Sequence, residues 1–190
     1  MTRTAVTVPL AELRMKARRH AFMRAQHKNL LIFLLGLLVG LEFFENGMFI
    51  FGANYIMGGV DAAPEEFVRA QASYAVGSLI TIVLQQRLTM RFGYKRFLLA
   101  TIVLFMGGLW GCAKSNSIDQ MVLARLVLGA GGGAFFTSSR ILITLMFPLS
   151  ERFRASLWYA VCLIGASAVA PAFAAWVIET WDWSMVFYSV

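Results

Sequence analysis

The chain has 190 residues, of which 59% are hydrophobic and 14% are charged, and its mean hydropathy is +0.68. Soluble domains carry about 45–50% apolar and about 25% charged residues, so this composition leaves too little polar surface to cover a water-soluble globule. The two cysteines, Cys112 and Cys162, lie inside apolar runs and have no disulfide or metal-ligand spacing. The chain is therefore predicted to lie in a membrane, with the lipid bilayer as an expected partner.

The formal net charge of +7 is concentrated before residue 30, where seven basic side chains stand against the single acid Glu12. A basic segment beside an apolar span is typical of a cytoplasmic anchor on anionic lipid, where each basic residue contributes about 1 kcal/mol. No motif that reads DNA or RNA accompanies it, so no nucleic acid partner is expected. Residues 1–29 are interpreted as a basic cytoplasmic arm, with a short helix from Pro9 along the membrane.

Six apolar segments follow the arm. Five are long enough to span a bilayer, which takes about 20 mainly apolar residues, and the sixth is cut off at Val190. Their continuous hydropathy favours helices over the alternating strands of a membrane barrel. We predict an all-α membrane protein in which residues 30–190 form a half-bundle. Its spans are expected at 30–57, 68–86, 97–113, 121–147, 156–178 and 184–190, the last incomplete.

The charges between the spans predict the orientation, because Lys and Arg are retained on the cytoplasmic side. The connections at 58–67 and 179–183 carry acidic side chains and no basic ones. Those at 87–96 and 148–155 carry four and two basic side chains. The amino terminus is therefore predicted to be cytoplasmic, in a multi-pass protein of the plasma membrane, or of the inner membrane in a bacterium.

Small residues recur at helical spacing and predict close helix packing. The GxxxG pairs are Gly36 and Gly40, Gly107 and Gly111, and Gly129 and Gly133. The run at 129–134 also imitates a dinucleotide-binding fingerprint, which requires a preceding strand in a soluble βαβ unit. Since this run lies inside a membrane span, packing is the interpretation that we adopt.

Three motifs carry a family resemblance. They are the basic connection from Arg87 to Arg96, the fourth span from Ala124 to Gly129 with Phe147-Pro148 after it, and the fifth span around Ala170-Pro171. Together they resemble the N-terminal half of the major facilitator superfamily, and particularly the fourteen-helix branch of its drug:proton antiporters.

The resemblance implies the half-bundle of a transporter, built as a 3+3 inverted repeat, whose path is closed by a C-terminal half missing after Val190. It implies proton-coupled efflux of drugs or other small amphipathic molecules, with substrate and protons as partners. The residues that it implies in the cytoplasmic basic loop are Arg87, Arg91, Gly93, Lys95 and Arg96. Those that it implies in the antiporter-like motif are Gly165, Ala170, Pro171, Ala174 and Ala175, in which the three alanines stand where the family has glycines.

Charges inside the spans are the main functional signal, because each costs about 2.5–3.5 kcal/mol at mid-membrane. Glu42 and Glu45 share a helix face, about 18 and 22 Å from the cytoplasmic side. Arg125 lies about 6 Å from the outer side, at a depth similar to that of Glu45. An ion pair between them, or one bridged by Asn46, would act as a proton switch or as a static pair that fixes helix register. Glu42 could alternatively face a cavity and bind a cationic substrate, and the sequence does not separate these roles.

Arg140 lies near the inner boundary of the fourth span, where its side chain can reach water by snorkelling or can serve in a substrate cavity. Both histidines lie in the arm, so no catalytic relay or metal triad can form in the membrane, and neither an enzyme nor a cofactor is expected. Two alternatives to transport are a non-transporting accessory protein on the same half-bundle and a membrane enzyme whose active part lies elsewhere.

Overall fold

A computed structural model describes the backbone of residues 10–190 and the side chains of residues 29–190. Residues 1–9 lie outside the described part of the chain. From Leu10 the backbone of the basic arm is helical and continues without a break into the first span, so the short helix predicted from Pro9 is not a separate element. The regular elements in them are all helices. They are α1 (Leu10–Phe51), α2 (Ala53–Gly59), α3 (Pro64–Phe92), α4 (Tyr94–Ala113), α5 (Ile118–Met146), α6 (Leu149–Thr180) and α7 (Met185–Tyr188).

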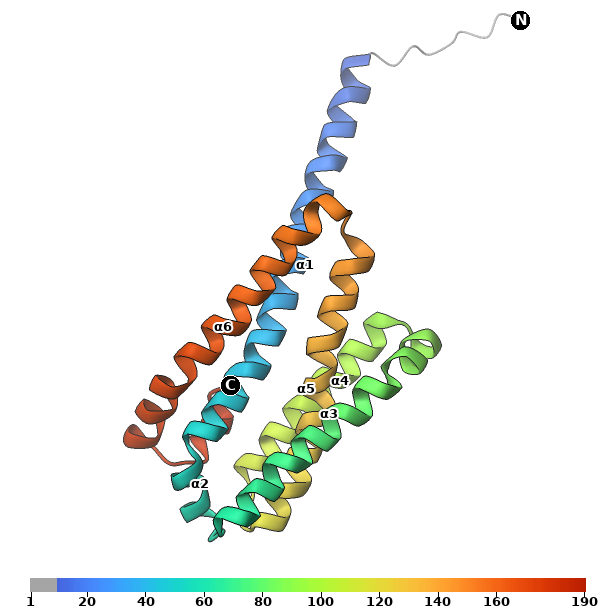
Figure 1. Cartoon of the computed structure of the whole chain (residues 1–190). Coiled ribbons are helices and arrows are strands. Elements are labelled where there is room, and N and C mark those ends of the chain that lie inside the picture. Colours follow the sequence, from blue (N-terminus) through green and yellow to red (C-terminus); the bar gives the residue numbers. More distant parts are fainter. Residues whose placement is uncertain (1–9) are drawn as a thin grey trace, which may run out of the picture.

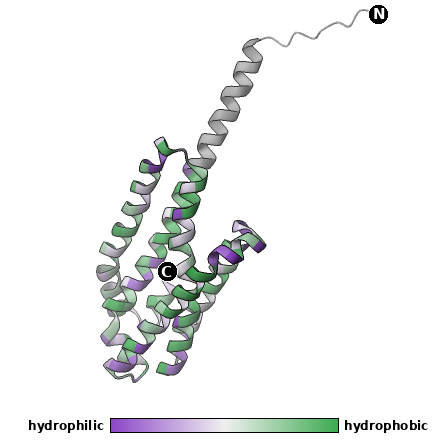
Figure 2. Ribbon diagram, turned by 45° about the vertical axis from the view of Figure 1, so that its right-hand side comes forward, coloured by the Kyte–Doolittle hydropathy of each residue, from purple (hydrophilic) through white to green (hydrophobic). Residues whose placement is uncertain are grey.

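Five of these helices are long and apolar enough to cross a membrane: α1 from Asn29 onward, α3, α4, α5 and α6. The predicted all-α half-bundle is therefore confirmed. Figure 2 shows hydrophobic residues along most of the ribbon and hydrophilic residues gathered at the turns between helices. The helices extend past several predicted boundaries because helix geometry continues through the polar turns outside the hydrocarbon.

The first span was predicted to run to Met57, and that boundary is wrong. The helix α1 ends at Phe51, and the short helix α2 begins at Ala53. Gly52 separates them, with its N–H donating to the Met48 carbonyl at 2.8 Å. Hydropathy continues through Gly52 and does not register the break, whereas the low helix propensity of glycine favours an interruption there.

The helices form two packed groups. One contains α1 and α6, the other contains α3 and α4 on either side of α5, and the groups meet where α1 crosses α5 (Figure 1). In sequence the helices form two triplets: α1, α3 and α4, and then α5, α6 and the segment that begins with α7. The contact of α1 with α6 is equivalent to the contact of α5 with α3, because each joins the first helix of one triplet to the second helix of the other. This exchange is the arrangement expected of a 3+3 inverted repeat.

The glycines of α5 make this packing possible. A Cβ atom at Gly129 would collide with the Tyr74 carbonyl of α3, and one at Gly131 would collide with the backbone of α4 at Phe105. The helices therefore approach one another closely on two faces of α5. The predicted GxxxG role of Gly107 is wrong, because a Cβ there would meet no atom within 4 Å, and Gly108 makes the close contact, with Leu128.

Candidate functional site

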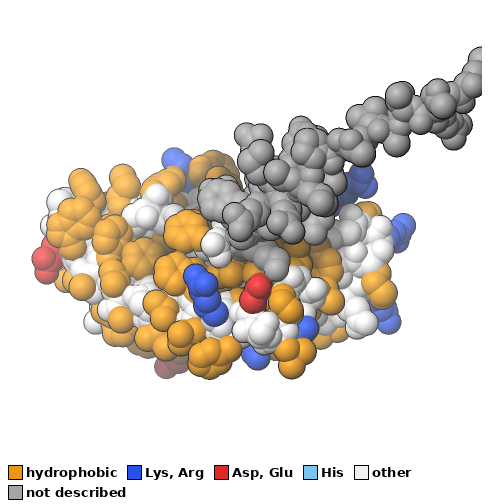
Figure 3. Space-filling model, turned by 90° about the horizontal axis from the view of Figure 1, so that it is seen from above, with side chains coloured by type: hydrophobic (Ala, Val, Ile, Leu, Met, Phe, Trp, Pro, Cys, Tyr) orange, Lys and Arg blue, Asp and Glu red, His pale blue; other side chains and the backbone are white. Residues whose placement is uncertain are grey.

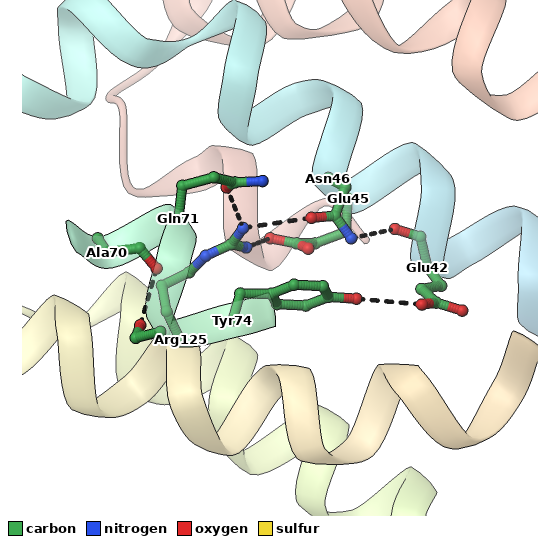
Figure 4. A network of polar contacts seen from close by, with 8 residues as sticks. Glu42, Glu45, Asn46, Ala70, Gln71, Tyr74 and Arg125 are labelled. Carbon is green, nitrogen blue, oxygen red and sulfur yellow. Dashed lines mark hydrogen bonds and ion pairs between the residues drawn. The ribbon is translucent and has the colours of Figure 1, made fainter. Parts of the chain in front are cut away.

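An ion pair in the interior of the bundle joins α1 to α5. Arg125 projects from α5 toward α1 and α3, as Figure 4 shows. Its Nη1 donates to Glu45 Oε1 at 2.6 Å, and the two side chains are 0% and 1% exposed. Because the pair is shielded from water on every side, neither charge has solvent as an alternative partner.

Further groups from α1 and α3 surround the guanidinium. Arg125 Nη2 donates to Gln71 Oε1 at 2.8 Å and to Asn46 Oδ1 at 3.3 Å. The guanidinium carbon lies 3.8 Å from the centroid of the Phe49 ring and 4.5 Å from that of the Tyr74 ring. Contacts between a desolvated cation and aromatic faces contribute about 2 kcal/mol each. Arg125 therefore holds three membrane helices together.

Glu42 lies one turn before Glu45 and contacts a different partner. The Tyr74 hydroxyl donates to Glu42 Oε1 at 3.2 Å, and only 7% of Glu42 is exposed. Its second oxygen, Oε2, is buried and accepts no hydrogen bond from the described residues, and the same holds for Glu45 Oε2. Tyr74 connects the two halves of the site, since its hydroxyl contacts Glu42 while its ring contacts Arg125.

The charge balance gives this cluster its chemistry. It contains two carboxylates and one cation, so with both acids ionised it carries one uncompensated negative charge in a medium where such a charge is costly. A proton on either carboxylate removes that excess. The cluster is therefore suited to exchange a proton, and among the described residues no group of three or more metal-ligating side chains is placed to hold a metal ion.

The structure brings together four of the five residues predicted for the site: Glu42, Glu45, Asn46 and Arg125. Arg140 lies about 22 Å further along α5 than Arg125 by helix rise, and about 12 Å beyond Gly132, the residue that Glu42 faces. Gln71 and Tyr74 were missed. The available signal was a pair of polar side chains, glutamine and tyrosine, one turn apart in an apolar span. The sequence does not show which face of α3 packs against the bundle, so it could not assign them to the site.

The basic-loop residues flank the turn between α3 and α4: Arg87 and Arg91 lie at the end of α3, Gly93 makes the turn, and Lys95 and Arg96 lie at the start of α4. Gly93 adopts a φ of +78°, a conformation that side-chain-bearing residues rarely adopt, and it ends α3 at Phe92 and starts α4 at Tyr94. The four basic side chains of this loop are exposed: Arg87, Arg91, Lys95 and Arg96. They lie away from the buried ion pair and have no contact with it.

The residues of the antiporter-like motif lie on α6. Ala170 and Ala174 are buried, and a Cβ at Gly47 of α1 would press against the Ala170 methyl group at 2.6 Å. Pro171 is half-buried inside the helix, whereas Gly165 and Ala175 are exposed. The small residues of the motif therefore allow α1 and α6 to pack closely and do not contact the charged cluster.

Comparison with known families matches residues 32–190 to the Major Facilitator Superfamily. The chain belongs to this superfamily. It is 27% identical over 124 residues to Multidrug resistance protein 3 of Bacillus subtilis, covering 65% of this chain and 24% of that protein. It is 23% identical over 154 residues to the Fatty acid resistance protein FarB of Neisseria gonorrhoeae, covering 81% of this chain and 30% of that protein.

A third relative is Multidrug resistance protein Stp of Mycobacterium tuberculosis, which is 30% identical over 119 residues, covering 62% of this chain and 22% of that protein. The chain thus spans about a quarter of the length of the curated relatives that it matches. The resemblance to multidrug transporters of the superfamily, inferred from the motifs, is confirmed.

The buried pair predicts strong energetic coupling. Arg125→Met leaves the Glu45 carboxylate buried without a counter-charge and should lower the free energy of unfolding by about 3–5 kcal/mol. Glu45→Met leaves the Arg125 guanidinium unpaired and should lower it by a similar amount. The double variant removes both charges, so it should cost several kcal/mol less than the sum of the two. Unfolding by SDS titration in mixed micelles measures all four proteins. Additive losses within about 0.5 kcal/mol would show that the two side chains do not interact.

Proposed function

We propose that the chain forms one wall of a proton-coupled efflux transporter for drugs or other small amphipathic molecules. The observation that carries the proposal is the buried cluster of two carboxylates and one cation between α1, α3 and α5. The printed names of the relatives, which refer to multidrug and fatty acid resistance, support amphipathic substrates. The wall is the first six-helix half, and a second bundle closes the transport path.

In this proposal Glu42 is the site of proton binding. Protonation of Glu45 would leave the buried Arg125 cation without an anion in direct contact, whereas protonation of Glu42 leaves the Glu45–Arg125 pair intact. The proton then removes the single excess charge of the cluster. With 7% of its surface exposed, Glu42 is accessible to a proton and is too enclosed for an organic cation in this conformation.

The charge change at Glu42 acts on the contact between the two triplets. An ionised Glu42 repels the Glu45 carboxylate one helical turn away and attracts the Arg125 guanidinium. A protonated Glu42 does neither. Because Tyr74 touches both Glu42 and Arg125, a change in the Glu42–Tyr74 hydrogen bond shifts α3 as well. Proton binding thereby biases the packing of α1 against α3 and α5, the helices that line the proposed path.

The coupling role of Glu42 predicts a specific transport defect in the complete transporter. Glu42→Gln should reduce substrate accumulation in acid-loaded inside-out vesicles to the level seen without a pH gradient, because the side chain no longer exchanges a proton. Downhill exchange of substrate should persist. Glu66→Gln, at a half-exposed acid at the start of α3 that pairs with Arg69, is the matched control outside the cluster and should behave as the wild type in transport. Unchanged gradient-driven accumulation in Glu42→Gln would refute the proton role.

We also propose that the amino terminus is cytoplasmic and that the protein lies in the plasma membrane, or in the inner membrane of a bacterium, since the basic turns share one end of the bundle. In a variant with Cys112 and Cys162 replaced by Ser, a cysteine at Asp61 or Asn116 should react with an impermeant thiol reagent added outside cells. A cysteine at Arg91 should react only after permeabilisation. Labelling of the Arg91 position in intact cells would reverse the orientation.

A further inference from the structure

A polar cavity lies between α5 and α6, at the end of the bundle where these two helices are joined. Its volume is about 310 Å³, at the lower end of the range of about 300–1,000 Å³ typical of small-molecule sites. Figure 3 looks onto this end and shows basic side chains among hydrophobic ones. The cavity is lined by Arg140, Ile143, Thr144, Arg152, Ser156 and Tyr159.

The lining carries two positive charges and no carboxylate. Arg152 is held in place by the end of α5, since its Nε donates to the Phe147 carbonyl at 2.9 Å and its Nη2 to the Thr144 carbonyl at 2.7 Å. The guanidinium of Arg140 lies 5.9 Å from the Phe136 ring centroid. Within residues 29–190, Arg140 forms no ion pair. Arg152 is thus committed to backbone carbonyls, and Arg140 has no anionic partner within this part of the chain.

The remaining walls combine hydroxyl groups with apolar surface. Thr144, Ser156 and Tyr159 contribute hydroxyls. The Thr144 hydroxyl donates to the Arg140 carbonyl at 2.9 Å and the Tyr159 hydroxyl to the Phe136 carbonyl at 3.4 Å, which leaves the Ser156 hydroxyl for a ligand. Ile143 and Tyr159 belong to a hydrophobic cluster with Leu35 and Val39 of α1. A ligand that fits these walls has a negatively charged, hydrogen-bond-accepting head and an apolar body.

We propose that this cavity binds the anionic head of an amphiphile, with Arg140 as its counter-charge. Arg140 lies six residues before the end of α5, about 9 Å by helix rise, so a head group can reach it from the membrane surface while the apolar body stays in hydrocarbon. A carboxylate or a phosphate accepts hydrogen bonds from the fork of a guanidinium in the same way. Both a free fatty acid and an anionic phospholipid therefore present the required chemistry.

Arg140 lies about 22 Å from Arg125 along α5 by helix rise, whereas Glu42 faces Gly132, about 12 Å from Arg140 along the same helix. Export of the bound amphiphile rests on the function proposed above, whereas its binding does not. A binding measurement therefore tests the cavity even if transport is absent, and a failure of transport alone leaves the assignment of the cavity intact.

The test is equilibrium binding of radiolabelled dodecanoate to the full chain in phosphatidylcholine nanodiscs, compared with dodecyltrimethylammonium, a cation of the same chain length. Dodecanoate should bind saturably and the cation should not. Arg140→Gln should weaken dodecanoate binding about tenfold, the loss expected for one charge-assisted hydrogen bond. Arg140→Lys should recover part of the affinity, and Arg69→Gln, at an exposed arginine of α3, should bind as the wild type.

Adding phosphatidylglycerol to the nanodiscs distinguishes the two sources of the head group. Displacement of dodecanoate assigns the site to an anionic lipid, and its retention assigns the site to a free amphiphilic acid. Equal binding of the anion and the cation would overturn the proposal. So would unchanged dodecanoate affinity in Arg140→Gln, provided that this variant elutes with the wild type in size-exclusion chromatography.

Discussion

The arrangement of the bundle depends on one requirement, that Arg125 must be neutralised where no water is available. A guanidinium in the membrane interior is tolerated only with a close anion and further hydrogen-bond acceptors, which Arg125 has for both Nη groups and, among the described residues, not for its buried Nε. Glu45 supplies the anion from α1, and Asn46 and Gln71 accept further hydrogen bonds. Because these groups come from α1 and α3 while Arg125 comes from α5, meeting the requirement fixes how the two helix triplets lie against each other.

The same requirement explains why the neighbouring acid is suited to function. Arg125 is already paired with Glu45, so Glu42 is left as the excess charge, with the Tyr74 hydroxyl as its one hydrogen-bond donor among the described side chains. A buried excess charge can be removed by a proton at little structural cost. The small residues of α5 and α6 contribute indirectly, because close helix approach keeps water out and makes the protonation state of Glu42 matter.

The sequence predicted the helical half-bundle and the Glu45–Arg125 contact because both depend on one-dimensional quantities, hydropathy and depth along a helix. It did not predict that Gln71 and Tyr74 complete the site, since the rotation of α3 about its axis depends on the glycine contacts with α5. For the same reason it placed Gly107 in a packing interface that Gly108 occupies. The end of the first span was missed because a single glycine breaks the helix without changing its hydropathy.

The most direct test of the account is infrared difference spectroscopy of the complete transporter in lipid between acidic and alkaline pH. A protonated carboxylic acid away from water gives a C=O stretching band that an ionised carboxylate lacks. The account predicts such a band at acidic pH, its loss in Glu42→Gln, and its retention in Glu66→Gln. A band that persists unchanged in Glu42→Gln, or a wild-type spectrum without one, would contradict the claim that Glu42 binds the transported proton.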